Sequence, residues 1–144
     1  MIKKNNKYII GIDPGVNTGY AVWSRVTKTM LVCETMPIHK AMAKIEKAIE
    51  LYDDKNMLLV KVEDARKRKW FGNAGREQLQ GAGSIKRDCK IWEDFLTDLK
   101  IDFELVAPKN NKTKLDAKKF KEITKWEAQT NEHSRDAAML VYNF

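Results

Sequence analysis

The chain has 144 residues, a formal net charge of +7 and a hydrophobic content of 43%. This length suits a single domain over residues 1–144, with enough apolar residues to form a core. No stretch is long and apolar enough to cross a bilayer, and the start lacks the apolar middle of a signal peptide, so we expect a cytoplasmic protein. Cys33 and Cys89 lack metal-ligand spacing, and we expect both to be idle thiols.

The pattern of apolar residues predicts an α/β fold. Strands are expected where apolar residues run together, and helices where they recur every three or four positions. The expected order is strand, strand, strand, helix, strand, helix, strand, helix, helix, over residues 8–13, 19–25, 30–36, 38–52, 57–63, 76–99, 102–106, 114–128 and 132–142. An antiparallel meander followed by right-handed crossovers gives a five-stranded mixed sheet, with two parallel strands and helices on both faces.

Two apolar strands end in a carboxylate. Asp13 closes the first strand and Glu63 closes the fourth, and both would meet if these strands lie side by side at the centre of the sheet. Taken alone, Asp13 before Pro14 would be a turn-capping residue, but Glu63 and the last helix favour a site. Asp64 points to the opposite face, because strand side chains alternate, and we expect it to be structural.

The last predicted helix carries a second pair of polar side chains. His133 and Asp136 are three positions apart, so they share a face of the helix. Together with Asp13 and Glu63 they would form an oxygen-rich pocket that suits a hard divalent cation such as magnesium. His133 at the start of a helix is equally consistent with a solvent-exposed residue, and this alternative stays open.

Basic residues gather in two segments. The first is Arg66, Lys67, Arg68 and Lys69, and the second spans residues 109–121 with six lysines. Two such clusters predict a polyanionic partner, most simply nucleic acid, although solvated basic faces are common in soluble proteins. Trp70 and Phe71 follow the first cluster, where they would stack on exposed bases or fold back into the core.

The order of elements and the motifs resemble the RuvC family of Holliday-junction resolvases, in the ribonuclease H-like superfamily. The family's G-I-D-P-G strand stands here as residues 11–15, followed by a Thr-Gly pair at 18–19. Glu63 matches its second carboxylate, and residues 133–136 (His-Ser-Arg-Asp) match its final H-x-x-D motif. The chain is shorter than cellular members and carries a basic stretch in place of their glycine-rich one, which is similar to the reduced resolvases of bacteriophages.

The resemblance implies a crossover junction endodeoxyribonuclease, which hydrolyses phosphodiester bonds of four-way junctions to resolve recombination or replication intermediates. It implies two magnesium ions, with manganese able to substitute. Asp13 would bridge both ions and Glu63 and Asp136 would each bind one. His133 would add a ligand or position water, and Lys119 best matches a catalytic lysine of the family. The expected DNA contacts are Arg66, Lys67, Arg68, Lys69, Trp70, Phe71, Arg76, Lys112, Lys114 and Lys118.

The family's two-fold symmetry implies a homodimer that nicks both strands of branched DNA. The apolar stripe of the long helix would supply the dimer face, pack on its own sheet, or do both; it includes Gly81, Ala82, Ile85, Cys89, Trp92 and Phe95. Three other functions remain alternatives to junction resolution. They are a nuclease for flaps and forks, a catalytically silent junction-binding protein, and a nucleotide-hydrolysing member of the actin and sugar-kinase group. The last needs two such domains, which 144 residues exclude.

Overall fold

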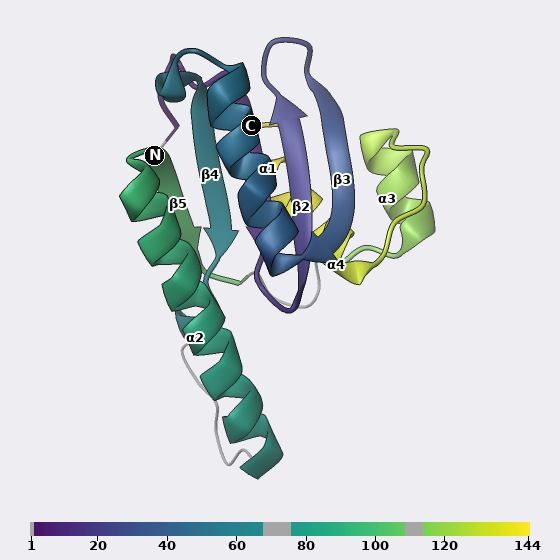
Figure 1. Cartoon of the computed structure of the whole chain (residues 1–144). Helices are drawn as coiled ribbons and strands as arrows, with labels where there is room; N and C mark the ends of the chain where they lie inside the picture. Colours follow the sequence, from purple (N-terminus) through teal and green to yellow (C-terminus); the bar gives the residue numbers. More distant parts are fainter. Residues whose placement is uncertain (1, 68–75, 109–113) are drawn as a thin grey trace.

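Five strands form one mixed sheet in the order β3-β2-β1-β4-β5 (Figure 1). The computed structural model describes residues 2–67, 76–108 and 114–144, with the side chains of 76–82 left out. The strands are β1 (Tyr8–Asp13), β2 (Asn17–Ser24), β3 (Thr29–Pro37), β4 (Leu58–Glu63) and β5 (Asp102–Val106). β1 to β3 form an antiparallel meander, and β4 and β5 are parallel to β1. The predicted sheet is therefore confirmed.

The register of the two central strands brings their ends together. β1 and β4 pair in parallel, with Ile12 opposite Val62. The next residue of each strand is Asp13 or Glu63, so both carboxylates stand at the same end of neighbouring strands. This end is the carboxyl edge of the parallel strands, where α/β proteins commonly place their sites.

Helices cover both faces of the sheet (Figure 1). They are α1 (Ile38–Leu51), α2 (Arg76–Leu99), α3 (Ala117–Thr124) and α4 (Glu132–Val141), with short 3-10 turns at Lys55–Met57 and Ala65–Lys67. α1 and α2 pack on one face, and α4 packs on the other. No helix in the described ranges has both the length and the apolar character needed to cross a membrane.

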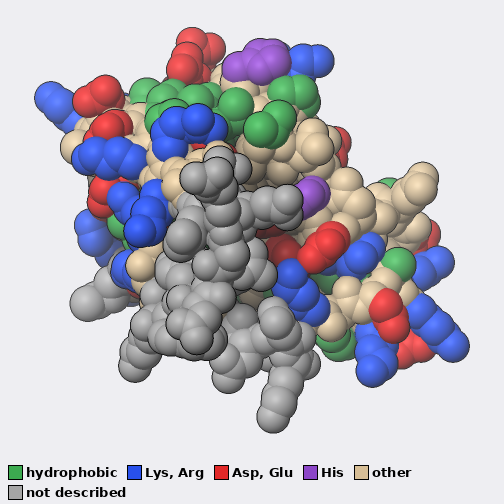
Figure 2. All heavy atoms as spheres, turned by 90° about the horizontal axis from the view of Figure 1, so that it is seen from below, with side chains coloured by type: hydrophobic (Ala, Val, Ile, Leu, Met, Phe, Trp, Pro, Cys, Tyr) green, Lys and Arg blue, Asp and Glu red, His purple; other side chains and the backbone are tan. Residues whose placement is uncertain are grey.

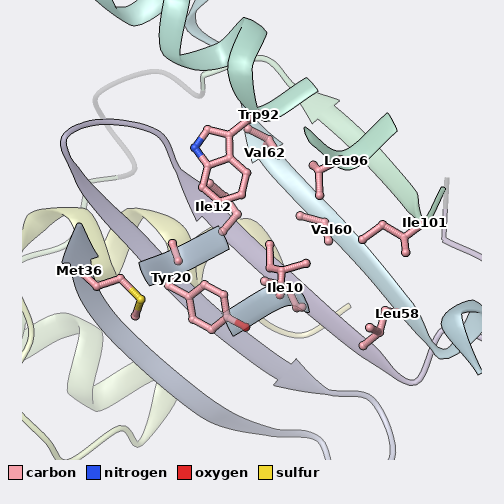
Figure 3. Packing of buried hydrophobic residues seen from close by; sticks show 12 residues of the cluster. Ile10, Ile12, Tyr20, Met36, Leu58, Val60, Val62, Trp92, Leu96 and Ile101 are labelled. Atoms are coloured by element: carbon pink, nitrogen blue, oxygen red, sulfur yellow. The ribbon is translucent and has the colours of Figure 1, made fainter. Parts of the chain in front are cut away.

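The alternating side chains of the central strands divide the core in two. Ile10 and Ile12 point to the face covered by α1 and α2, whereas Ile9 points to the α4 face. Figure 3 shows Trp92 of α2 beside Ile12 and Val62. Because Cys89, Trp92 and Leu96 are all 0% exposed, the apolar stripe of α2 packs on its own sheet. Ile85 of the same stripe is 41% exposed, and the dimer face on this helix stays a prediction.

The third helix differs most from the prediction. It was expected over residues 114–128 but spans Ala117–Thr124. Asp116 caps its start by accepting a hydrogen bond from the Lys119 backbone N–H at 2.8 Å, and it ends at Lys125, whose φ of 63° is left-handed. Ile123, expected to face inward, is 43% exposed. The other boundaries differ from the prediction by at most two residues.

Candidate active site

A pocket of about 170 Å³ opens at the carboxyl ends of β1 and β4. Figure 2 views the molecule from below and shows acidic, basic and histidine side chains on this face. All four residues predicted to form a site line the pocket. Its lining residues are Asp13, Pro14, Glu63, Ala65, Ile85, Cys89, Lys114, Glu132, His133 and Asp136. The pocket thus brings together Asp13, Glu63 and the His133–Asp136 pair, which are distant along the chain, as expected from the ends of the two strands and the last helix.

Two glycines allow α4 to approach the sheet closely enough to join the site. A Cβ atom at Gly19 would overlap the carbonyl oxygen of His133, and one at Gly11 would overlap the carbonyl oxygen of Ala137. Both glycines lie on the central strands β2 and β1. Absent side chains at these positions therefore set the distance between α4 and the strand that carries Asp13.

The start of α4 is fixed by a reciprocal cap. The Asn131 side chain accepts from the Ser134 N–H at 3.0 Å, and the Ser134 hydroxyl accepts from the Asn131 N–H at 3.0 Å. Thr35 of β3 donates to the Asn131 side chain at 2.6 Å, which ties the cap to the sheet. Arg135 donates to the carbonyl of Leu115 at 3.0 Å and so holds the segment before α3 against this helix. These bonds place Lys114 beside Asp136.

Asp13 is an acid of the pocket with a strongly raised pKa. Burial and the negative charge of Glu63 raise its pKa to about 7, with Asp136 adding to the rise and the hydrogen bond to His133 opposing it. The Asp13 Oδ2 atom lies 3.1 Å from Nδ1 of His133, and the Asp13 side chain is only 14% exposed. An ionised Asp13 is therefore costly unless a positive charge enters the pocket.

Lys114 supplies one positive charge. Its Nζ lies 2.8 Å from Oε1 of Glu132 and 3.9 Å from Oδ2 of Asp136. Burial raises the pKa of Asp136, and the lysine acts in the opposite direction. Lys114 is half-exposed, so this contact with Asp136 is free to rearrange at small cost.

The donor set fits a hard divalent cation, although the side chains do not form a finished coordination sphere. Carboxylates from Asp13, Glu63 and Asp136 with one imidazole are the ligand types that magnesium and manganese accept. Within the described parts of the chain, however, no three His, Cys, Asp or Glu side chains are arranged as a metal cluster. Burial, followed by the negative charge of Glu63, raises the pKa of Asp13, and a bound cation would favour its ionised form.

Arg66 does not stand free to meet a phosphate. Its guanidinium donates to both carboxylate oxygens of Asp64, at 2.8 and 2.9 Å, and to Glu93 at 3.3 Å. Asp64 is 2% exposed, and the hydrogen bonds from Arg66 lower its pKa. The structural role predicted for Asp64 is confirmed, whereas the predicted DNA contact of Arg66 competes with an intramolecular ion pair.

The remaining predicted DNA residues fall into two groups. Lys67, Lys118 and Lys119 are exposed, and Lys67 donates to the carbonyl of Leu105 at 2.7 Å. Lys119 does not line the pocket, so its predicted catalytic role has no support from its position. Outside the described residues or side chains lie Arg68, Lys69, Trp70, Phe71, Arg76 and Lys112.

Glu132 and Cys89 are among the lining residues that sequence reasoning did not assign to the site. Glu132 precedes His133 and pairs with Lys114, and its place in the first turn of the last helix was the available signal. Cys89 forms part of the wall, with its Sγ 3.8 Å from the carbonyl oxygen of Glu63. Its position on the buried stripe of α2 was predicted, but its proximity to Glu63 depends on how α2 crosses the sheet.

Comparison with known proteins supports the fold. No protein-family model and no curated protein matches the chain. Among solved structures, the chain is similar to T. thermophilus RuvC in complex with Holliday junction substrate, with a TM-score of 0.54 and 17% sequence identity. The alignment covers 90% of this chain and 87% of that chain. The fold is therefore the ribonuclease H-like α/β fold, as predicted, and the similarity to bacteriophage resolvases stays a prediction.

Proposed function

We propose that the protein is a metal-dependent endonuclease that cuts phosphodiester bonds at four-way DNA junctions. The observation that carries this proposal is the pocket in which Asp13, Glu63, Asp136 and His133 come together on a ribonuclease H-like sheet. The structural similarity to a RuvC resolvase agrees with this chemistry. The net charge of +7 agrees with a polyanionic substrate.

Asp13, Glu63 and Asp136 would hold two magnesium ions. The charges of Glu63 and Asp136 both act on Asp13, so Asp13 would serve both ions and each of the other two carboxylates would serve one. Bound magnesium, or manganese in its place, supplies Lewis-acid activation of the phosphodiester. The electrostatic cost of ionising Asp13 at neutral pH means that metal affinity falls as Asp13 takes up a proton.

His133 and Lys114 would act on the reacting groups. The contact with Asp13 engages Nδ1 of His133, which leaves Nε2 to hold a water molecule or to join the metal ligands. Lys114 would stabilise the negative charge that grows on the phosphate in the transition state. Its half-exposed ammonium lies within the pocket, whereas Lys119 lies outside its lining.

DNA would reach the pocket along basic surfaces on both sides. Lys114 lines the pocket, and we assign further contacts to Lys67, to Lys118 on α3 and to the predicted residues 68–71, 76 and 112. Cutting both strands of a junction calls for a homodimer of this single domain.

A panel of labelled DNA substrates tests this proposal. The protein would be incubated with magnesium and a four-way junction, a flap, a replication fork or linear duplex of the same sequence. We expect paired nicks in the junction and little cutting of duplex. Preferred cutting of flaps or forks would instead identify a different branched-DNA nuclease, and binding without cutting would identify a silent junction-binding protein.

A further inference from the structure

A second hollow, of about 360 Å³, lies on the face of the sheet that carries α1. We define this α1–β3 groove by Val22, Leu31 and Val32 on the strands and Lys44, Lys47 and Leu51 on the helix. Tyr8 and Leu58, which begin β1 and β4, also line it. The groove therefore lies toward the opposite end of these strands from Asp13 and Glu63. Figure 1 shows no described helix over β2 and β3 beside α1.

The groove exposes apolar side chains on both of its sides. Leu31 of β3 is 44% exposed and Leu51 of α1 is 74% exposed. Between them, the partly buried Val22 and Val32 pack against the core below. Tyr8 and Tyr52 stack at 4.6 Å between ring centroids among the same lining residues. This surface can take up a large apolar side chain and remove it from water.

A row of lysines runs along the helical side of the groove. Lys40, Lys44 and Lys47 are spaced by four and three residues, so they share one face of α1, and Leu51 continues the row. All three lysines are exposed. No residue that lines the groove is acidic.

Acids also stand next to this row, because Glu50 follows Lys47 by three positions on α1 and Glu34 lies on the neighbouring strand β3. Lys44 pairs with Glu34 of β3 at 2.9 Å, with side chains 45% and 51% exposed, and an exposed pair of this kind contributes little energy. Lys47 makes no ion pair with any residue in the described ranges. The groove thus presents a positive edge beside an apolar floor, and that edge attracts negative charge.

We propose that the α1–β3 groove binds an acidic segment of a partner protein that carries a large apolar side chain. The apolar side chain would lie between Leu31 and Leu51, and its flanking carboxylates would pair with Lys44 and Lys47. Nucleic acid is the weaker candidate, because phosphates would leave the apolar floor uncovered. The proposal does not rest on nuclease activity. Because the groove and the acidic pocket lie toward opposite ends of β1 and β4, the partner and the DNA substrate can bind at the same time.

Fluorescence anisotropy with a short labelled peptide tests this site. The peptide carries Asp and Glu residues around one Phe and one Leu, and two control peptides replace either the apolar pair by Ala or the acids by Lys. We expect saturable binding of the first peptide and at least about fivefold weaker binding of the Ala peptide. Equal affinity for the acidic peptides with and without Phe and Leu would overturn the proposal, as would no binding.

Matched variants locate the site on the protein. Lys47→Glu should weaken peptide binding by about tenfold or more, whereas Lys4→Glu, the same charge change at an exposed residue outside the groove, should alter it less than about twofold. Leu31→Ser should weaken binding of the Phe–Leu peptide but not of the Ala peptide. If Lys47→Glu and Lys4→Glu weaken binding equally, charge attraction alone explains the binding and the proposal is contradicted. The same conclusion follows if linear duplex DNA displaces the peptide from the wild-type protein.

Discussion

The Nδ1 atom of His133 lies 3.1 Å from Oδ2 of Asp13, although 120 residues separate them in the sequence. This contact joins the end of the central strand to the first turn of the last helix. The sequence left His133 open between an exposed helix residue and a member of the site. The structure shows both properties, since the side chain is 47% exposed and yet contacts Asp13, a carboxylate of the pocket whose pKa is raised.

Magnesium should stabilise the folded protein. Because the carboxylates repel one another in the metal-free pocket, a cation that binds only the folded state raises the free energy of unfolding, by about 1.4 kcal/mol at ten times its dissociation constant. For a chain of this size we expect a rise in Tm of roughly 3–6 °C. Differential scanning fluorimetry with magnesium or with chelator measures this. In Asp13→Asn the rise should vanish, and an equal rise in that variant would place the ion elsewhere.

Removing the charge of Asp13 should stabilise the metal-free protein at alkaline pH. Burial and Glu63 raise the pKa of Asp13 from 3.8 to about 7, so the folded state holds this proton more tightly than the unfolded state. A raised carboxyl pKa means that stability is lost as pH rises from about 4 to about 7. Asp13→Asn abolishes this loss.

Urea unfolding in chelator checks the effect. At about pH 8, Asp13→Asn should exceed wild type by roughly 1–3 kcal/mol, since one pKa unit corresponds to about 1.4 kcal/mol. Near pH 4 the two proteins should converge. Asp98→Asn, at an exposed position on α2, is the control and should show no such gain. Equal stabilities of wild type and Asp13→Asn at pH 8 would contradict the crowding of charge in the pocket.

Replacing Gly19, which lies against α4, by a residue with a side chain should destabilise the protein. Gly19→Ala places a Cβ against the His133 carbonyl, so the helix must move, and we expect a loss of about 2–4 kcal/mol together with loss of activity. Gly83→Ala is the matched control, because its Cβ would meet open space in the middle of α2. That change should be neutral or stabilise by up to about 1 kcal/mol. Thermal melts of both variants measure the difference, and a tolerated Gly19→Ala would show that α4 is not held this closely.

Replacement of Lys114 should slow DNA cleavage much more than replacement of Lys119. Lys114→Ala removes the ammonium within 3.9 Å of Asp136, and we expect junction cleavage to slow by about 10- to 100-fold with DNA binding changed much less. Lys119→Ala, on the exposed surface of α3, should slow it by less than about threefold. Single-turnover cleavage rates and binding constants for both variants provide the measurement. A larger effect at Lys119 would restore the sequence-based assignment.

Much of this architecture follows from patterns that are local in the sequence. Apolar runs at 8–13 and 58–62 predict central strands, and the meander and crossover rules then place Asp13 beside Glu63. The periodic apolar residues between 114 and 128 suggested a helix longer than Ala117–Thr124, which begins after the capping residue Asp116. The hydrogen bond between Arg66 and Asp64 was not predicted, because a run of basic residues usually indicates solvent-exposed side chains.

Other features depend on the distance between elements, which a single sequence does not encode locally. The close approach of α4 to Gly11 and Gly19 is one such feature, because both glycines resemble ordinary strand or turn residues. Gly83 is a contrasting case, because a Cβ atom at this glycine inside α2 would meet only open space. The position of Lys114 likewise depends on the bond from Arg135 to the Leu115 carbonyl.

The most direct test of the proposed chemistry is cleavage of a synthetic four-way junction by wild type and by Asp13→Asn, each with magnesium and with chelator. Wild type should nick the junction only with magnesium. Asp13→Asn should bind the junction with similar affinity and cut it at least about 10³-fold more slowly. Cleavage that persists in chelator, or that survives in Asp13→Asn, would contradict a metal-dependent site built around this carboxylate.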